Sequence, residues 1–357
     1  METTLLATDT PASLAAAVEA AARSLAAGDP VALPTETVYG LAADALRPDA
    51  VLKIFEAKER PLFDPLIVHL PDRDWLERVT KIPVESRALV EALIAKFWPG
   101  PLTLVLPRRS EGRAPARPHS TDARERVPPV PDIVTSGLDT VAVRMSAHPV
   151  FRAVIERFGK PLAAPSANRF GRISPTTAAH VRSELDGRIR LIVDGGATEH
   201  GVESTIMKVD NGRLMILRAG PITPDDLAQF GKLECAARRS RPHAPGQFKS
   251  HYAPHTPLLL RESWDGWEKA ICPSRATDYG VRRGLLAWRE GAPDRFYERV
   301  EILSSTADLR EAAATLFAKL RRLDEAGLDF IFAEPVPEHG LGIAIMDRLR
   351  KAAAHHV

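Results

Sequence analysis

The stretch of this sequence with the most chemical potential is Pro34–Leu41, Pro-Thr-Glu-Thr-Val-Tyr-Gly-Leu, which follows the short apolar run Val31–Leu33. A strand that ends in Thr-Glu-Thr presents two hydroxyls and a carboxylate at a strand end, and open α/β sheets bind their ligands at strand ends. An ordinary loop punctuated by proline and glycine has the same composition. The octapeptide therefore marks a candidate site, and the remaining motifs decide between the two interpretations.

Several cations follow predicted elements and suit an anionic ligand. Lys58 and Arg60 lie two residues apart just after a predicted helix, beside Pro61, and arginine suits phosphate oxygens through its bidentate geometry. Arg144 ends one predicted strand and Arg218 follows another, so the two could converge on one anion. Solvated surface charges, or cations that offset a helix dipole, explain the same residues equally simply.

Two polar turns lie next to predicted strands. Pro165–Asn168 precedes Gly171–Pro175, and small hydroxyl residues with a glycine before a helix suit phosphate binding, although helix capping has the same composition. Gly201–Ile206 is a glycine and polar turn that enters a strand. His69 lies within an apolar strand, which is more typical of a buried structural histidine. The sequence contains no Walker-type phosphate loop, Gly-x-Gly-x-x-Gly, His-Glu-x-x-His or Cys-x-x-Cys, so it predicts no metal-ligating residues.

The composition is that of an ordinary globular protein. Of 357 residues, 45% are hydrophobic and 26% charged, and the net charge of +2 neither requires nor excludes a nucleic-acid partner. Cys235 and Cys272 are too few for a disulfide framework, which predicts an intracellular, cytoplasmic location. Neither a long apolar run nor a signal peptide is recognisable, so no membrane association is predicted.

Alternating helices and strands are predicted to position these residues. Helices are expected over 11–27, 48–59, 84–97, 149–158, 176–185, 307–326 and 342–353, and strands over 31–33, 66–70, 102–106, 140–144, 161–164, 189–193, 205–209, 214–217, 258–260, 284–288 and 328–332. Asn211-Gly212 between two of these strands is a strong hairpin signal. The predicted fold class is α/β, with one twisted mixed sheet and flanking helices, then a small Rossmann-like α/β domain.

The distribution of proline and charge divides the chain. We predict a first domain over 8–225, a proline-rich linker over 226–257 and a C-terminal α/β domain over 258–357. Periodicity is lost over 108–131, where six arginines stand against three acidic residues, so this segment is predicted to be a flexible insertion. Contact with nucleic acid through these arginines is the alternative.

Taken together, the motifs resemble those of YrdC-like proteins, and they occur in the same order. The matching segments are Pro34–Leu41, Lys58–Pro61, Pro65–His69, Trp98–Thr103, Thr140–Arg144, Ala164–Asn168, Ser174-Pro175, Gly201–Ile206 and Arg218–Gly220. The resemblance covers about residues 10–225, and His251–Pro254 is similar to the linker of a long form with an extra C-terminal domain. The family is that of the threonylcarbamoyl-AMP synthases.

This resemblance implies an ATP-dependent nucleotidyltransferase. L-threonine, bicarbonate and ATP would give threonylcarbamoyl-AMP and pyrophosphate, and a downstream threonylcarbamoyl transferase would modify tRNA with the product, forming threonylcarbamoyladenosine. Magnesium on the phosphates would help neutralise the leaving pyrophosphate, and no prosthetic group is implied. Two alternatives stay open, a double-stranded RNA-binding module and a relative that carbamoylates another acceptor.

The family's site residues carry over onto matching positions of this sequence. The implied L-threonine contacts are Thr37, His69, Arg144, Ala164 and Ser204, with Arg144 as the partner of the threonine carboxylate. The implied ATP contacts are Arg60, Asp64, Thr140, Ser166, Ser174, Arg218 and, from the linker, Tyr252. Lys58 and Arg60 are expected to be the catalytic cations on the β- and γ-phosphates. Asp64 stands where the family often has Asn, Ser146 stands where Pro is common, and Glu36 is expected to organise the cations.

Overall fold

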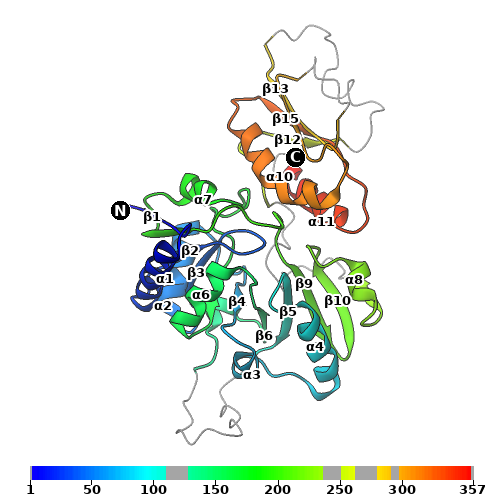
Figure 1. Ribbon diagram of the computed structural model, residues 1–357. Coiled ribbons are helices and arrows are strands. Elements are labelled where there is room, and N and C mark those ends of the chain that lie inside the picture. The colour runs from blue at the N-terminus through cyan, green and yellow to red at the C-terminus, as the bar shows by residue number, and fades with distance from the viewer. Residues whose placement is uncertain (1, 110–127, 236–250, 262–279, 291–296, 355–357) are drawn as a thin grey trace, which may run out of the picture. The chain divides into compact units, whose positions relative to one another are not determined.

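The computed structural model describes residues 2–109, 128–235, 251–261, 280–290 and 297–354, and it divides into two compact units (Figure 1). Unit 1 comprises Met1–Phe170, Pro175–Glu199 and Glu203–Gln247, and unit 2 comprises Gly171–Ser174, His200–Val202 and Phe248–Val357. Most of the predicted insertion and residues 236–250 of the predicted linker lie outside the described residues. No helix within the described ranges is long and apolar enough to cross a membrane.

Eleven of the described strands form the sheet of unit 1, in the spatial order β1-β8-β2-β3-β7-β4-β6-β5-β9-β10-β11. In chain order they are β1 (Thr4–Ala7), β2 (Val31–Leu33), β3 (Gly40–Asp44), β4 (Ile67–His69), β5 (Leu102–Pro107), β6 (Thr140–Arg144), β7 (Leu162–Ala163), β8 (Leu191–Asp194), β9 (Thr205–Asp210), β10 (Arg213–Arg218) and β11 (Leu233–Cys235). The sheet contains parallel pairs such as β4–β6 and β5–β9 and antiparallel pairs such as β2–β3 and β5–β6. The predicted mixed sheet is therefore confirmed.

The helices of unit 1 pack along this sheet. They are α1 (Pro11–Ala26), α2 (Pro48–Lys58), α3 (Asp74–Val79), α4 (Val84–Phe97), α5 (Asp132–Thr135), α6 (Pro149–Phe158), α7 (Ala178–Leu185) and α8 (Pro224–Ala228). Helix α1 begins as predicted, because the Thr10 hydroxyl accepts a hydrogen bond from the Ser13 amide. Helix α8 and strand β11 both overlap the predicted linker, and β11 pairs with β10, so residues up to 235 extend the sheet of unit 1.

The two faces of the central strands are buried differently. On β6, Val141 and Val143 join a large apolar cluster, whereas Ala142 joins a small cluster on the opposite face. The small cluster consists of Ile67, Val105, Ala142 and Ile206, one residue from each of four neighbouring strands. Strand side chains alternate between faces, so polar residues two positions from these four lie on the face of the small cluster. Those residues are His69, Thr103, Thr140, Arg144, Ser204 and Lys208.

Within the described part of unit 2, four parallel strands form a second sheet in the order β12-β15-β13-β14. They are β12 (Leu258–Leu260), β13 (Arg283–Ala287), β14 (Arg299–Ile302) and β15 (Phe330–Ala333). Helix α10 (Leu309–Asp324) packs against β13 and β14, and α11 (Gly342–Ala353) packs against β12. Parallel strands with crossover helices confirm the small α/β domain predicted for this region.

Candidate active site

The octapeptide forms the loop that joins strands β2 and β3 in a hairpin. Leu33 pairs with Gly40, so residues 34–39 protrude beyond the ladder. The Thr35 hydroxyl donates to the Val38 carbonyl at 2.6 Å, and the buried Tyr39 hydroxyl donates to the Gly196 carbonyl at 2.7 Å. Burial raises the pKa of Tyr39, which keeps its hydroxyl protonated as a donor. The loop is therefore fixed both internally and against the end of β8.

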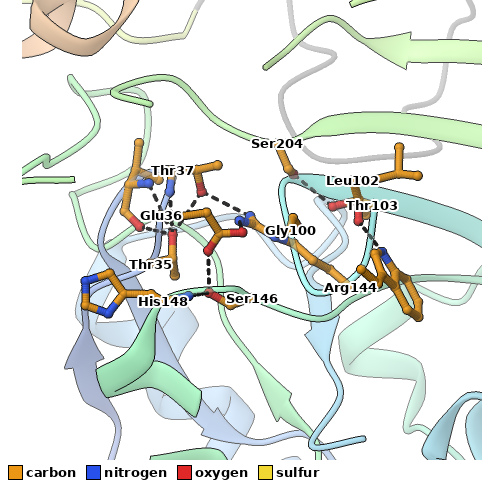
Figure 2. Close-up of polar contacts among 12 residues, drawn as sticks. Thr35, Glu36, Thr37, Gly100, Leu102, Thr103, Arg144, Ser146, His148 and Ser204 are labelled. Carbon is orange, nitrogen blue, oxygen red and sulfur yellow. Dashed lines mark hydrogen bonds and ion pairs between the residues drawn. The ribbon is translucent and has the colours of Figure 1, made fainter. Parts of the chain in front are cut away.

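Glu36 and Arg144 form a buried ion pair at the centre of the site (Figure 2). Arg144 Nη2 donates to Glu36 Oε1 at 2.6 Å, Nη1 donates to Thr37 Oγ1 at 3.0 Å, and Nε donates to the Gly100 carbonyl at 3.3 Å. The Ser146 hydroxyl donates to Glu36 Oε2 at 2.5 Å. Burial alone would raise the pKa of Glu36, but Arg144 and the hydrogen bond from Ser146 lower it to about 2. The carboxylate is therefore ionised at neutral pH, as an organiser of the cation.

His69 lies beside this pair, because it is directly opposite Arg144 in the parallel register of β4 and β6. Its side chain is buried, and its ring centroid lies 4.7 Å from that of Phe151. Within the described ranges, Nδ1 of His69 has no hydrogen-bond partner. Burial, with the nearby Arg144 charge, lowers the pKa of His69 to about 3. The imidazole is therefore neutral at physiological pH.

Ser204 and Arg218 connect the positions implied for threonine with those implied for ATP. The Ser204 hydroxyl shares a hydrogen bond of 2.8 Å with Thr103. Arg218 donates to both Ser204 oxygens, at 3.0 Å to the hydroxyl and 3.1 Å to the carbonyl. Gly220 permits this arrangement, because a Cβ there would overlap the backbone of residues 203–205. One residue from each predicted set is thus in direct contact.

A second buried ion pair follows helix α2. Arg60 Nη2 lies 2.7 Å from Asp64 Oδ2 and donates to the Pro65 carbonyl at 2.9 Å, and both charged side chains are buried. Burial raises the pKa of Asp64, although Arg60, Lys58 and Arg218 all act to lower it. Asp64 therefore lies within the field of three cations, all of which the resemblance assigns to the phosphate side of the site.

Lys58 ties the end of helix α2 to the loop that follows β7. Its ammonium group donates to the Ser166 carbonyl at 2.5 Å and to the Asn168 carbonyl. Burial and the Arg60 charge lower its pKa well below the ordinary value. In the same loop, the Ala164 amide donates to the Ile67 carbonyl at 2.9 Å, and Ala164 thereby extends the pairing of β4. Lys58 thus positions this loop, and its contact with phosphate stays a prediction.

The other predicted ATP contacts belong to different parts of the structure. Thr140 stands at the start of β6, whereas Arg144 stands at its end, about 13 Å away at strand spacing. Ser174 and Tyr252 belong to unit 2, where both are buried and the Tyr252 ring packs against Phe317 at 5.6 Å. No group of three or more residues able to hold a metal ion occurs among the residues that the structure describes.

Sequence reasoning did not assign Thr103 and Ser146 to the site. Thr103 was detectable by strand alternation, because it shares a face with Val105, but its hydrogen bond with Ser204 depends on the pairing of β5 with β9. Ser146 follows β6 and carries no motif of its own. Its contact with Glu36 depends on two segments more than a hundred residues apart.

Comparison with known proteins yields matches to both units. A family model described as "Telomere recombination" matches residues 23–220, and a model described as the threonylcarbamoyl-AMP synthase C-terminal domain matches residues 222–354. The threonylcarbamoyl-AMP synthase of Bacillus subtilis is 42% identical over 343 residues, covering 94% of this chain and 93% of the relative. That of Pyrococcus abyssi is 38% identical over 355 residues, covering 95% of each. The crystal structure of P. abyssi Sua5 complexed with L-threonine aligns with a TM-score of 0.83 at 37% identity, covering 99% of this chain and 98% of that one.

Proposed function

The chain belongs to the threonylcarbamoyl-AMP synthase family, and we propose that its buried Arg144–Glu36 site binds L-threonine for conversion, with bicarbonate and ATP, into threonylcarbamoyl-AMP and pyrophosphate. The observation that carries this proposal is the contact between Ser204 and Arg218, which joins a set of groups suited to an amino acid to a set suited to phosphates. A reaction between an amino-acid derivative and a nucleotide needs both sets side by side.

Arg144 supports binding of the threonine carboxylate. Arg144 uses three of its five N–H groups in hydrogen bonds to described residues, one each from Nε, Nη1 and Nη2. One N–H group therefore remains on each of Nη1 and Nη2. Two adjacent N–H groups suit a carboxylate, since charge-assisted bonds from a guanidinium are strong and directional. Thr37 and Ser204 would add hydroxyls, and Ala164 would add a backbone contact, as the resemblance implies.

Neutral His69 is proposed to contact the amino or hydroxyl group of threonine. A pKa of about 3 makes the imidazole a weak base, so its role is that of a hydrogen-bonding group which adds no positive charge. The absence of charge matters because the threonine amine must itself lose a proton before it captures bicarbonate as a carbamate. A cationic His69 would repel the ammonium form of the substrate and add a third buried charge to the Arg144–Glu36 pair.

The phosphate side is proposed to stabilise charge on the nucleotide. A carbamate oxygen attacks the α-phosphorus in line, the bond from that phosphorus to the bridging oxygen breaks, and pyrophosphate leaves with the electron pair. Arg60, Arg218 and Lys58 would stabilise this negative charge, and Ser166 would contact ATP as the resemblance implies. Magnesium is proposed to arrive on the phosphates of ATP, because the carboxylate of Asp64 lies in the field of three cations.

The biological setting follows from the product. A carbamoyl adenylate is a reactive mixed anhydride, so we propose a downstream threonylcarbamoyl transferase that moves the group to tRNA. We also propose that these steps take place in the cytoplasm, where tRNA and ATP are available. Double-stranded RNA binding without turnover is the competing function.

The test is pyrophosphate release from ATP by the full chain, with the product identified by mass spectrometry. Release that requires both L-threonine and bicarbonate is expected. ATP hydrolysis indifferent to threonine, or salt-sensitive RNA binding with no turnover, would overturn the proposal.

A further inference from the structure

Ser146 is a buried serine that touches the site without belonging to the residues implied by the resemblance. It lies two residues after Arg144, and its hydroxyl donates to Glu36 Oε2 at 2.5 Å while accepting from the His148 amide at 3.3 Å. The two oxygens of Glu36 are thus held by different residues, Oε1 by Arg144 and Oε2 by Ser146 (Figure 2). Glu36 consequently contacts the guanidinium of Arg144 through one oxygen.

We propose that Ser146 is a positioning residue that keeps the Glu36–Arg144 contact to one oxygen and so preserves the N–H groups of Arg144 for the substrate carboxylate. The inference rests on the function proposed above. It concerns Arg144 alone and makes no claim on the ATP side.

The physical reason lies in the geometry of guanidinium–carboxylate pairs, which favour two parallel hydrogen bonds. If the Ser146 hydroxyl is absent, Glu36 Oε2 loses a partner in a buried environment, where an unsatisfied charged oxygen is costly. Rotation of the carboxylate toward Arg144 would satisfy that oxygen. It would also occupy an N–H group that the substrate carboxylate needs, so an internal carboxylate would then compete with the substrate.

The experiment compares Ser146→Ala with Ser146→Thr, which keeps the hydroxyl. Ser146→Ala is expected to raise the KM for threonine and its calorimetric Kd by about 10-fold, the usual effect of losing one charge-assisted hydrogen bond. The KM for ATP should change less than about 2-fold, and Ser146→Thr should restore threonine affinity. Ser86→Ala is the matched control, because Ser86 is also buried and accepts a hydrogen bond, but from Gly212 in the β9–β10 turn.

The Glu36→Gln background separates positioning from a general structural role. An amide has no second charged oxygen to rotate onto Arg144, so adding Ser146→Ala to Glu36→Gln is expected to change threonine affinity less than about 2-fold. Equal weakening in both backgrounds, or unchanged affinity in Ser146→Ala alone, would overturn the inference. Calorimetry together with the pyrophosphate assay distinguishes the two proposals. If threonine binding depends on Ser146 but no pyrophosphate is released, the proposed reaction is refuted and the positioning role of Ser146 is kept.

Discussion

Replacing Glu36 with glutamine should destabilise the ligand-free protein strongly, although the side chain keeps its size and shape. Glu36 and Arg144 are 5% and 4% exposed, so neither charge is compensated by solvent. In Glu36→Gln the guanidinium keeps its burial and loses its counter-charge. Removing one partner of a buried ion pair costs about 3–5 kcal/mol, which is more than the net value of the intact pair.

The titration of Glu36 gives a second measure of this magnitude. A pKa lowered from 4.5 to about 2 corresponds to about 3.4 kcal/mol in favour of the ionised carboxylate, at about 1.4 kcal/mol per pKa unit. Because the pKa in the folded state is the lower one, this stability is fully present above pH 4.5 and is lost as pH falls toward 2. The cost of breaking the ion pair and the pKa shift of Glu36 both predict that Glu36→Gln lowers the free energy of unfolding by about 3 kcal/mol at pH 7.

The assay is urea unfolding at pH 7, monitored by the fluorescence of Trp75 and Trp98, which are buried in unit 1. Glu19→Gln is the matched control, since Glu19 pairs with Arg157 at a site where the two side chains are 44% and 57% exposed. An exposed pair of this kind contributes at most about 1 kcal/mol. If Glu36→Gln lowers the urea midpoint no more than Glu19→Gln does, the charge of Glu36 does not compensate Arg144.

Three further predictions concern neighbouring groups. Arg144→Ala should raise the KM for threonine by about 10-fold or more with little change in the KM for ATP. Arg60→Ala should raise the KM for ATP by a similar factor with little change in the KM for threonine. Wild-type kinetics in both variants would refute the site assignment. The free energy of unfolding should fall as pH drops from 6.5 toward 3, because His69 becomes protonated in the unfolded state while the buried imidazole stays neutral in the folded state. His69→Asn should reduce this pH dependence, which urea unfolding at several pH values measures. Asp64→Asn should lower the urea midpoint less than Glu36→Gln does, because burial already opposes the ionised form of Asp64; an equal loss would contradict that difference.

Most long elements of the fold were predictable because their signals are local. Helix α6 was predicted over Pro149–Phe158, and in the structure Pro149 opens it and Gly159 ends it in the left-handed conformation. The β9–β10 hairpin followed from Asn211-Gly212, both of which adopt positive φ in the turn. Strands β1 and β3 were missed, because Thr4–Ala7 is largely exposed and Gly40–Asp44 carries alanines and a glycine in place of β-branched residues.

The membership of the site stays a prediction from the resemblance, and its internal pairing could not be predicted from the sequence. The resemblance assigned Thr37, Arg144 and Ser204 to one site, and the register of neighbouring strands explains why Arg144 and Ser204 share one face. The predicted cations Lys58, Arg60, Arg144 and Arg218 each contact a group elsewhere in the chain, and such contacts arise only from the tertiary structure. Glu36 reaches Arg144 across 108 positions of sequence, and no local pattern encodes such a contact.

Glu36 and Asp64 each compensate a buried arginine, but their pKa values are shifted in opposite directions. A site that binds anions must bury cations before the anion arrives, and an unpaired buried cation is costly. Glu36 compensates Arg144 with a pKa lowered by that cation and by Ser146, so its charge is fixed, and the proposed substrate carboxylate would use the N–H groups that remain on Arg144. Asp64 compensates Arg60 with a pKa raised by burial, and within the described residues its oxygens accept no hydrogen bond. Asp64 is thus the weaker competitor, which suits the proposed role of Arg60, because phosphates that carry several charges would have to displace Asp64 from it.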